Sequence, residues 1–222
     1  MSKKGFFITG TDTGVGKTFF SSILMKKFDF DYWKPIQTGK FTENDTLYIK
    51  ENIGIEKNRF HKPIYSFKKP LSPHLASSYE KISINMKKIK IPSSDKPLII
   101  EGAGGILVPL NKKNLLIDLI KKFKLPVIVV SKSILGTINH TLMTLEILKK
   151  NKINIFGVIL NNIKNKKEGD ENAESIEKYG NIKVLGKISS INHVTRKKIE
   201  ALSKKNLLVD SVYEKLKINK TR

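Results

Sequence analysis

The sequence contains no cysteine among its 222 residues, which excludes disulfide bonds and metal sites built from thiolates. Long apolar runs are also missing, since no stretch approaches the roughly 20 apolar residues that a membrane-spanning helix requires. The first four residues lead directly into a short apolar stretch, without room for the apolar core of a signal peptide. These absences predict a soluble protein of the cytoplasm.

Acidic residues are scarce, because 20 Asp and Glu stand against 42 Lys and Arg, for a formal net charge of +22. Such a charge attracts polyanions, nucleic acids among them. The lysines are nevertheless spread along the whole chain, whereas a nucleic-acid footprint should gather on one element. We attribute the excess to a general compositional bias, and we expect neither nucleic acid nor a membrane as a partner.

Apolar runs of strand length alternate with amphipathic helical stretches, which is typical of parallel β-α-β units. A chain of this length with 39% hydrophobic residues can bury one α/β core. We therefore predict a single α/β domain over residues 1–222, with a doubly wound, mainly parallel sheet and helices on both faces. Residues 52–97 carry five prolines and no clear strand, and we expect them to form an irregular excursion that covers the site.

The expected strands cover Lys4–Thr9, Asp31–Ile36, Pro97–Glu101, Pro126–Ser131, Asn154–Leu160 and Lys183–Ile188. The expected helices cover Lys17–Phe28, Thr42–Asn52, Pro73–Glu80, Asn114–Lys122, Thr137–Lys150, Asp170–Tyr179, Val194–Lys205 and Val212–Lys217.

The most informative segment, Ile8 to Thr18, reads ITGTDTGVGKT. An apolar stretch precedes it and apolar residues at helical spacing follow, so it has the strand-loop-helix context of a phosphate-binding loop, or P-loop. Its glycines let backbone N–H groups approach a polyphosphate, and the start of the helix adds the positive end of its dipole. The loop is one residue longer than the common form, because Thr11 stands where glycine is usual and Gly10 precedes it. The segment predicts a nucleoside triphosphate site in a fold of the P-loop NTPase type.

Within this loop, Lys17 is expected to reach the β- and γ-phosphates, and Thr18 to bind Mg²⁺ through its hydroxyl. The residues of the loop and first helix expected to contact the nucleotide are Gly14, Val15, Gly16, Lys17, Thr18 and Phe19.

Ligands of open parallel sheets bind at the carboxyl ends of the strands, so residues that follow expected strands are candidates. Lys34 at the end of the second strand is either directed at the nucleotide or a solvated lysine. Asp45 begins a helix, where it either favours the helix dipole or binds a metal. Glu101 ends the third strand and resembles the second metal-binding acid of P-loop proteins, although Asp is usual there.

Two other strand ends carry polar or small residues. The glycine-rich residues 102–105 follow Glu101 and would let another anion approach the backbone. Asn161 and Asn162 follow the fifth expected strand, where their amides suit an adenine edge; turn formation explains them almost as well.

Together these motifs resemble the dethiobiotin synthetases over nearly the whole chain. The matching segments are 10–18, 34–35 with 38–39, 72–74, 101–105, 136 with 139–140, and 161–162. The resemblance implies a homodimeric, ATP-dependent cyclo-ligase of biotin synthesis. Such an enzyme forms a carbamate from CO₂ and one amine of 7,8-diaminononanoate, phosphorylates it with Mg-ATP, and closes the ureido ring with release of ADP and phosphate.

The resemblance also implies roles for individual residues. Lys17 and Lys34 would be catalytic, neutralising the transferring phosphoryl group and the carbamate, and Mg²⁺ would be held by Thr18, Asp45 and Glu101. The further nucleotide contacts would be Gly102, Ala103, Gly104, Asn161 and Asn162, and the substrate contacts would be Thr13, Lys34, Thr38 and Gly104. The chain departs from the family pattern at Asn162, where Asp is frequent, and at Ser189, where Pro is common.

Two other interpretations compete at this point. A partitioning-type P-loop ATPase would use ATP to control dimerisation and the basic surface to hold DNA or a protein partner. Such proteins usually carry an additional lysine early in the loop, and Gly10 to Thr13 contain none. A non-enzymatic nucleotide-binding module would leave Lys34 and Glu101 unexplained.

Overall fold

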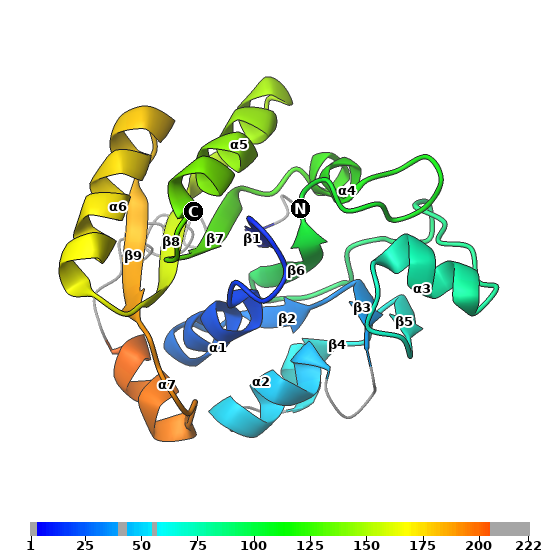
Figure 1. Cartoon of the computed structure of the whole chain (residues 1–222). Coiled ribbons are helices and arrows are strands. Elements are labelled where there is room, and N and C mark those ends of the chain that lie inside the picture. Colours follow the sequence, from blue (N-terminus) through cyan, green and yellow to red (C-terminus); the bar gives the residue numbers. More distant parts are fainter. Residues whose placement is uncertain (1–3, 40–43, 55–56, 205–222) are drawn as a thin grey trace, which may run out of the picture.

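The structure, a computed structural model, describes residues 4–39, 44–54 and 57–204, and it is built on a seven-stranded sheet (Figure 1). All neighbouring strands in this sheet are parallel, in the order β4-β2-β6-β1-β7-β8-β9. The strands are β1 (Gly5–Gly10), β2 (Asp31–Trp33), β4 (Phe60–His61), β6 (Leu98–Gly105), β7 (Val127–Lys132), β8 (Ile155–Ile163) and β9 (Val184–Ser189). A second sheet pairs β3 (Ile36–Thr38) with β5 (Tyr65–Phe67).

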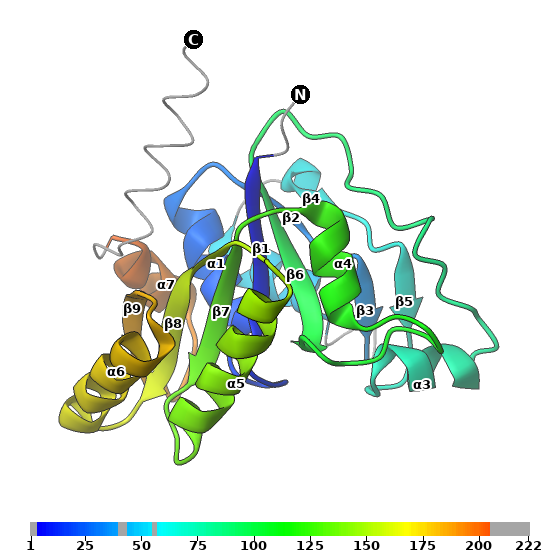
Figure 2. The ribbon, with the colours of Figure 1, turned by 90° about the horizontal axis from the view of Figure 1, so that it is seen from above.

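Helices cover both faces of the main sheet, as the two views in Figure 1 and Figure 2 show. They are α1 (Lys17–Lys27), α2 (Asp45–Ile53), α3 (Pro73–Tyr79), α4 (Leu116–Phe123), α5 (Thr137–Lys150), α6 (Lys166–Gly180) and α7 (Arg196–Ser203), with a 3-10 turn, η2, at Lys57–Arg59. Helices α1, α2 and α7 pack on one face, and α4, α5 and α6 on the other. The sheet is thus doubly wound, as predicted.

The alternation of side chains along β1 divides the interior into two hydrophobic cores. Phe6 and Ile8 belong to the core beneath α1, α2 and α7, whereas Phe7 belongs to the core beneath α4, α5 and α6. All residues of β1 are buried. A strand buried on both faces needs continuous apolar sequence, which explains the GFFI stretch directly before the P-loop.

The expected strand Asp31–Ile36 is wrong as a single element. The chain leaves the main sheet after Trp33, and β3 begins at Ile36 in the second sheet. Pro35 lies at the break, where it has no N–H to donate, and its carbonyl accepts the N–H groups of Ile64 and Tyr65.

The expectation that residues 52–97 lack strands is also wrong, because β4 and β5 lie within them. These strands have two and three residues, too few to show an alternation in the sequence. Strand β8 runs on to Ile163, so Asn161 and Asn162 lie inside a strand and not after it.

Helix α5 has the predicted bounds, while α6 begins four residues earlier than expected. The expected start at Thr42, the end at Lys205 and the helix Val212–Lys217 lie outside the described residues. Within the described ranges, no helix has both the length and the apolar character needed to cross a membrane.

Candidate active site

The P-loop joins β1, the central strand of the main sheet, to α1. Gly14 and Gly16 adopt left-handed backbone conformations, with φ of 66° and 98°. Glycine adopts this conformation at little cost, which explains both positions. Gly16 is the N-cap residue of α1 and no side chain caps the helix, so its first N–H groups face the site as an anion-binding end.

Asn161 of β8 supports this loop from the neighbouring side. Its Nδ2 donates a hydrogen bond to the carbonyl oxygen of Val15 over 2.9 Å, and the contact is buried. A Cβ at position 16 would lie 2.0 Å from the same nitrogen. Gly16 is therefore required by close packing as well as by its backbone conformation.

A cavity of about 400 Å³ opens beside the loop, at the carboxyl ends of β1, β2 and β6. It brings together most of the site residues predicted from the sequence: Thr13, Gly14, Gly16, Lys17, Thr18, Phe19, Lys34, Thr38, Asp45, Glu101, Ala103 and Gly104. Four of them do not line it, namely Val15, Gly102, Asn161 and Asn162. Val15 is buried under the loop, and Gly102 faces Phe7 and Leu116 in the core.

Lys34 and two carboxylates form the charged centre of this cavity. The Lys34 Nζ lies 2.5 Å from Asp45 Oδ2 and 3.1 Å from Glu101 Oε1. The Thr18 hydroxyl contacts the same two groups, at 2.5 Å from Asp45 Oδ1 and 2.8 Å from Glu101 Oε1. Residues from α1, α2, β6 and the break after β2 thus meet at one point.

The charges of this cluster stabilise one another. Burial alone would lower the pKa of Lys34, but the negative charges of Glu101 and Asp45 outweigh it and raise that pKa. Burial alone would raise the pKa of Asp45, and the Lys34 charge with hydrogen bonds from Lys34, Thr18 and Gln37 lowers it instead. Lys34 is therefore cationic and Asp45 anionic at neutral pH.

Lys17 behaves differently from Lys34. Its Nζ donates to the carbonyl oxygen of Asp12 over 2.9 Å. Burial and then the nearby positive charge of Lys34 lower its pKa to about 8, although Glu101, Asp45 and Asp12 act in the opposite direction. Lys17 therefore loses its proton in a pH range in which Lys34 remains charged.

Four residues around the site were missed in the sequence. Gln37 and Tyr48 line the cavity, and the buried Gln37 Oε1 has no hydrogen-bond partner in the described structure. Tyr32 and Ser21 donate hydrogen bonds to Glu101 Oε2 over 3.0 and 2.9 Å.

A signal for Tyr32 and Ser21 was present in the sequence. Tyr32 lies two residues before Lys34, which places both on one side of an extended strand. Ser21 lies three residues after Thr18, which is one helical turn. Burial, and then the charges of Glu101 and Asp45, raise the pKa of Tyr32 well above its usual value, so its hydroxyl stays protonated and donates.

The oxygen donors of the cluster fit Mg²⁺. A hydroxyl from Thr18 and carboxylates from Asp45 and Glu101 are hard ligands of the kind this ion takes. Among the residues that the structure describes, no three His, Cys, Asp or Glu side chains form a metal-binding group. Mg²⁺ needs no such group, because it commonly uses one or two carboxylates with phosphate oxygens and water.

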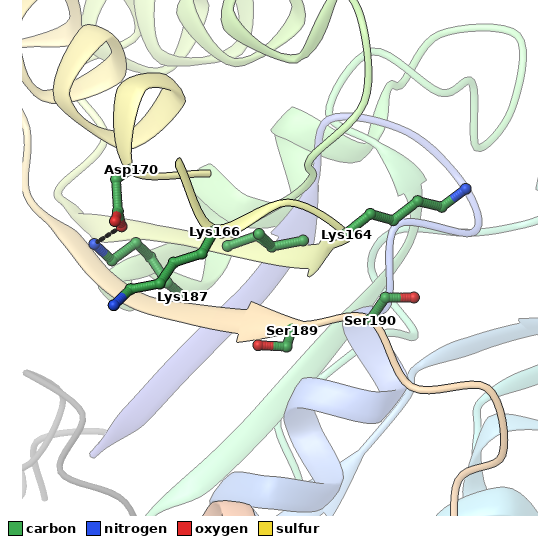
Figure 3. Close-up of a pocket in the computed structure, with 7 residues that line it drawn as sticks. Lys164, Lys166, Asp170, Lys187, Ser189 and Ser190 are labelled. Atoms are coloured by element: carbon green, nitrogen blue, oxygen red, sulfur yellow. Dashed lines mark hydrogen bonds and ion pairs between the residues drawn. The ribbon is translucent and has the colours of Figure 1, made fainter. Parts of the chain in front are cut away.

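A second hollow, of about 640 Å³, lies at the carboxyl ends of β8 and β9 (Figure 3). Its lining is Ile163, Lys164, Lys166, Asp170, Lys187, Ser189 and Ser190. Lys187 pairs with Asp170, and Figure 3 shows Lys164 extending away from these two residues. The hydroxyl of Ser190 donates to Asn162 Oδ1 over 3.0 Å, so Asn162 is held at the edge of this hollow.

A parallel sheet with a P-loop after its central strand, and with lysine, threonine and two acids around the loop, defines a P-loop NTPase. Solved structures agree on the fold. A ParA family ATPase from Chlorobium tepidum superposes with a TM-score of 0.58 at 12% identity, over 91% of this chain and 98% of that protein. A plasmid partition protein from Borrelia burgdorferi, described as putative, gives 0.53 at 14% identity, over 94% and 95%.

Sequence comparisons identify the family. A family model described as an AAA domain matches residues 4–198. The ATP-dependent dethiobiotin synthetase BioD of Paramagnetospirillum magneticum is 43% identical over 90% of this chain and 94% of its own length, and that of Lawsonia intracellularis is 44% identical over 86% and 90%. The bifunctional biotin biosynthesis protein BioCD of Bordetella avium is 40% identical, over 94% of this chain and 44% of its own length. The chain belongs to the family of ATP-dependent dethiobiotin synthetases.

Proposed function

We propose that the cavity beside the P-loop catalyses the ATP-dependent conversion of 7,8-diaminononanoate and CO₂ into dethiobiotin, ADP and phosphate. The observation that carries this proposal is the convergence of Lys17, Lys34, Thr18, Asp45 and Glu101 on one cavity. Phosphoryl transfer depends on positioning and on neutralising charge, and these five side chains supply both.

The reaction has three steps. One amine of the diamine adds to CO₂ and loses a proton, which gives a carbamate. A carbamate oxygen then takes the γ-phosphoryl group of ATP, and ADP leaves. The second amine attacks the carbonyl carbon of the mixed anhydride and loses a proton, phosphate departs with the bonding electron pair, and the ureido ring closes.

Two lysines act on these steps. Lys17, in the loop, neutralises the β- and γ-phosphates, and Lys34 neutralises the carbamate and the phosphoryl group as it moves. Mg²⁺, held by Thr18, Asp45 and Glu101, would neutralise phosphate oxygens. Lys34 suits its role because its ammonium stays charged and already lies at the cavity wall.

The diamine is proposed to bind next to Lys34, with contacts from Thr13, Thr38 and Gly104, which line the same cavity. A neighbouring hollow begins at Thr11 and Asp12 of the loop and has a more apolar lining that includes residues 106–109. We assign the hydrocarbon chain of the diamine to this hollow, since apolar surface suits methylene groups.

The base is proposed to lie near Asn161 and Asn162. Because Asn161 Nδ2 binds the Val15 carbonyl and Asn162 Oδ1 accepts from Ser190, a base would meet Asn161 Oδ1 and Asn162 Nδ2. An acceptor and a donor would match the N6 amine and a ring nitrogen of adenine. The remaining nucleotide contacts proposed all line the cavity: Gly14, Gly16, Lys17, Thr18, Phe19, Ala103 and Gly104.

We further propose that the protein is a cytoplasmic homodimer whose partners are small-molecule substrates alone. Exposed apolar side chains support a dimer: Ile134 and Leu135 before α5, Met143 on that helix, and Leu107 after β6. Of these, Leu135 is fully exposed. Burial of such side chains against a second copy would remove apolar surface from water.

A coupled assay tests the proposal. Purified protein is incubated with Mg-ATP and bicarbonate, with and without the diamine, and dethiobiotin is followed by mass spectrometry beside ADP release. We expect ADP release to require the diamine and to match the product mole for mole. ADP release that ignores the diamine but rises with DNA would instead indicate a partitioning-type ATPase.

A further inference from the structure

The carboxylate of Glu101 is held from two sides. Its Oε1 is shared by Thr18 and Lys34 at the cavity wall. Its Oε2 points into the protein and accepts hydrogen bonds from Tyr32 and Ser21. Glu101 is 1% exposed, and Tyr32 and Ser21 are fully buried.

The two donors on the inner side come from rigid elements. Tyr32 lies on β2 and pairs in register with Ile99 of β6, two residues before Glu101 on that strand. Its ring packs edge-on against Phe60, with the two ring centroids 6.2 Å apart, inside the range of about 4.5–7 Å typical of aromatic pairs. Ser21 lies on the second turn of α1. Packing therefore fixes both hydroxyls before any ligand binds.

The inner hydrogen bonds hold the plane of the carboxylate. Without them the group could rotate about its terminal bond, and neither oxygen would be held toward the site. With Tyr32 and Ser21 on Oε2, the remaining oxygen Oε1 stays next to Thr18 Oγ1 and 3.1 Å from the Lys34 Nζ. Hydrogen bonds of this kind orient metal-binding carboxylates and tune their affinity.

We propose that Tyr32 and Ser21 are positioning residues for the reaction: they fix Glu101 so that Oε1 is presented to Mg²⁺. Neither hydroxyl touches the substrates. The inference rests on the proposed function, because it assigns Glu101 to the metal of Mg-ATP. A purely structural role, in which the two hydroxyls only satisfy a buried carboxylate, would leave metal affinity unchanged.

The test uses Tyr32→Phe, Ser21→Ala and the double variant, each of which removes only hydroxyl groups. Ser22→Ala is the matched control, since Ser22 is equally buried on the same helix but donates to the Thr18 carbonyl. Tyr179→Phe on the exposed face of α6 is the control for the phenol. Binding of Mn²⁺ is measured by electron paramagnetic resonance with a non-hydrolysable ATP analogue, and binding of that analogue alone is measured in EDTA.

We expect about 10- to 100-fold weaker Mn²⁺ binding for the double variant and a smaller loss for each single variant. Analogue binding in EDTA should stay within about twofold of wild type, and both controls should bind Mn²⁺ normally. In steady-state kinetics, a high Mg²⁺ concentration should restore the turnover of the variants, because it compensates for their weaker metal binding. Unchanged Mn²⁺ affinity in the two single variants and the double variant overturns the proposal.

This experiment separates the two proposals. If the variants bind Mn²⁺ more weakly than wild type but wild type makes no dethiobiotin, the proposed reaction fails and the positioning of Glu101 toward the metal stands. If wild type makes dethiobiotin and the variants bind Mn²⁺ as tightly as it does, only the positioning role fails. Should the double variant unfold, circular dichroism reveals it, and the single variants decide the question.

Discussion

Lys34 is the residue on which the chemistry depends most. Its buried ammonium is balanced by two carboxylates, and the ion pair with Glu101 is almost completely removed from water. Removing one partner of a buried ion pair leaves charge unpaired, which costs more than the pair itself contributes. Substitution of Lys34 therefore affects both turnover and stability, and the two effects must be measured separately.

We predict that Lys34→Met lowers kcat by about 100-fold or more, while ATP affinity stays within a few-fold of wild type. Met retains the volume of the aliphatic stem and removes the charge that acts on the carbamate and phosphoryl group. The unfolding free energy should fall by about 2 kcal/mol, less than for a fully buried pair because Asp45 is partly exposed. Steady-state kinetics, calorimetry with ATP and urea unfolding give the three values. Wild-type turnover in the Lys34→Met variant would show that Lys34 has no catalytic role.

Lys17 makes nucleotide binding dependent on pH. Its pKa is lowered to about 8 by burial and by Lys34, and the negative charge of a polyphosphate will raise it again. Below pH 7 the free protein already carries the proton, whereas between pH 8 and 9 binding must take a proton up. ATP binding should therefore consume a proton at pH 8.5 and almost none at pH 6.5.

Calorimetric titrations of ATP in EDTA, in two buffers of different ionisation enthalpy, measure this proton uptake. Lys17→Met should abolish the proton uptake at pH 8.5. Equal uptake at both pH values in wild type would contradict the assignment to Lys17.

Much of the site was predictable at the residue scale, because P-loop chemistry is encoded in adjacent residues. The cavity indeed collects Lys17, Thr18, Lys34, Asp45 and Glu101, as the strand ends indicated. The roles of these residues remain proposals. The inner bonds to Glu101 were not predicted, since they depend on which strands become neighbours.

At the scale of elements, the contact of β8 with the P-loop is the least local feature of the site. We expected Asn161 to bind the adenine base. In the structure its Nδ2 donates a hydrogen bond to the Val15 carbonyl oxygen. The apolar pattern of the sequence predicted strand β8, but the predicted strand ended at Leu160, three residues before the observed end at Ile163. Pro35 likewise divided an expected strand, because the sequence pattern did not reveal that the chain changes sheets there.

We predict that Asn161→Ala destabilises the protein by about 1–2 kcal/mol, because it leaves a buried carbonyl without a donor. Nucleotide affinity should fall about tenfold, since the loop loses its support. Asn172→Ala on α6, whose hydrogen bond to Ser133 is long at 3.4 Å, is the control. Urea unfolding and ATP titration measure the two effects, and an affinity equal to that of the control would contradict a supporting role for Asn161.

At the scale of the whole molecule, alternating strands and helices were enough to predict a doubly wound parallel sheet. The short second sheet was not predicted, because its strands have three residues each. The net charge of +22 gave no information about the fold.

The proposed homodimer gives a test at this scale. We predict that Leu135→Asp shifts the protein toward monomers, because a carboxylate would have to be buried in place of a fully exposed apolar side chain. Light scattering after size-exclusion chromatography measures the mass. Tyr179→Asp, at another exposed position, is the control. A dimer that both variants retain would place the interface elsewhere.

The bond between Asn161 and the Val15 carbonyl spans 146 positions of the chain. Contacts so distant in sequence form late in folding, because bringing the two ends of a long segment together costs conformational entropy. During synthesis on the ribosome, the phosphate loop emerges among the first residues but reaches its final shape only after β8 has emerged and joined the sheet. A nascent chain that ends before β8 therefore carries the complete P-loop sequence without the hydrogen bond that supports the loop.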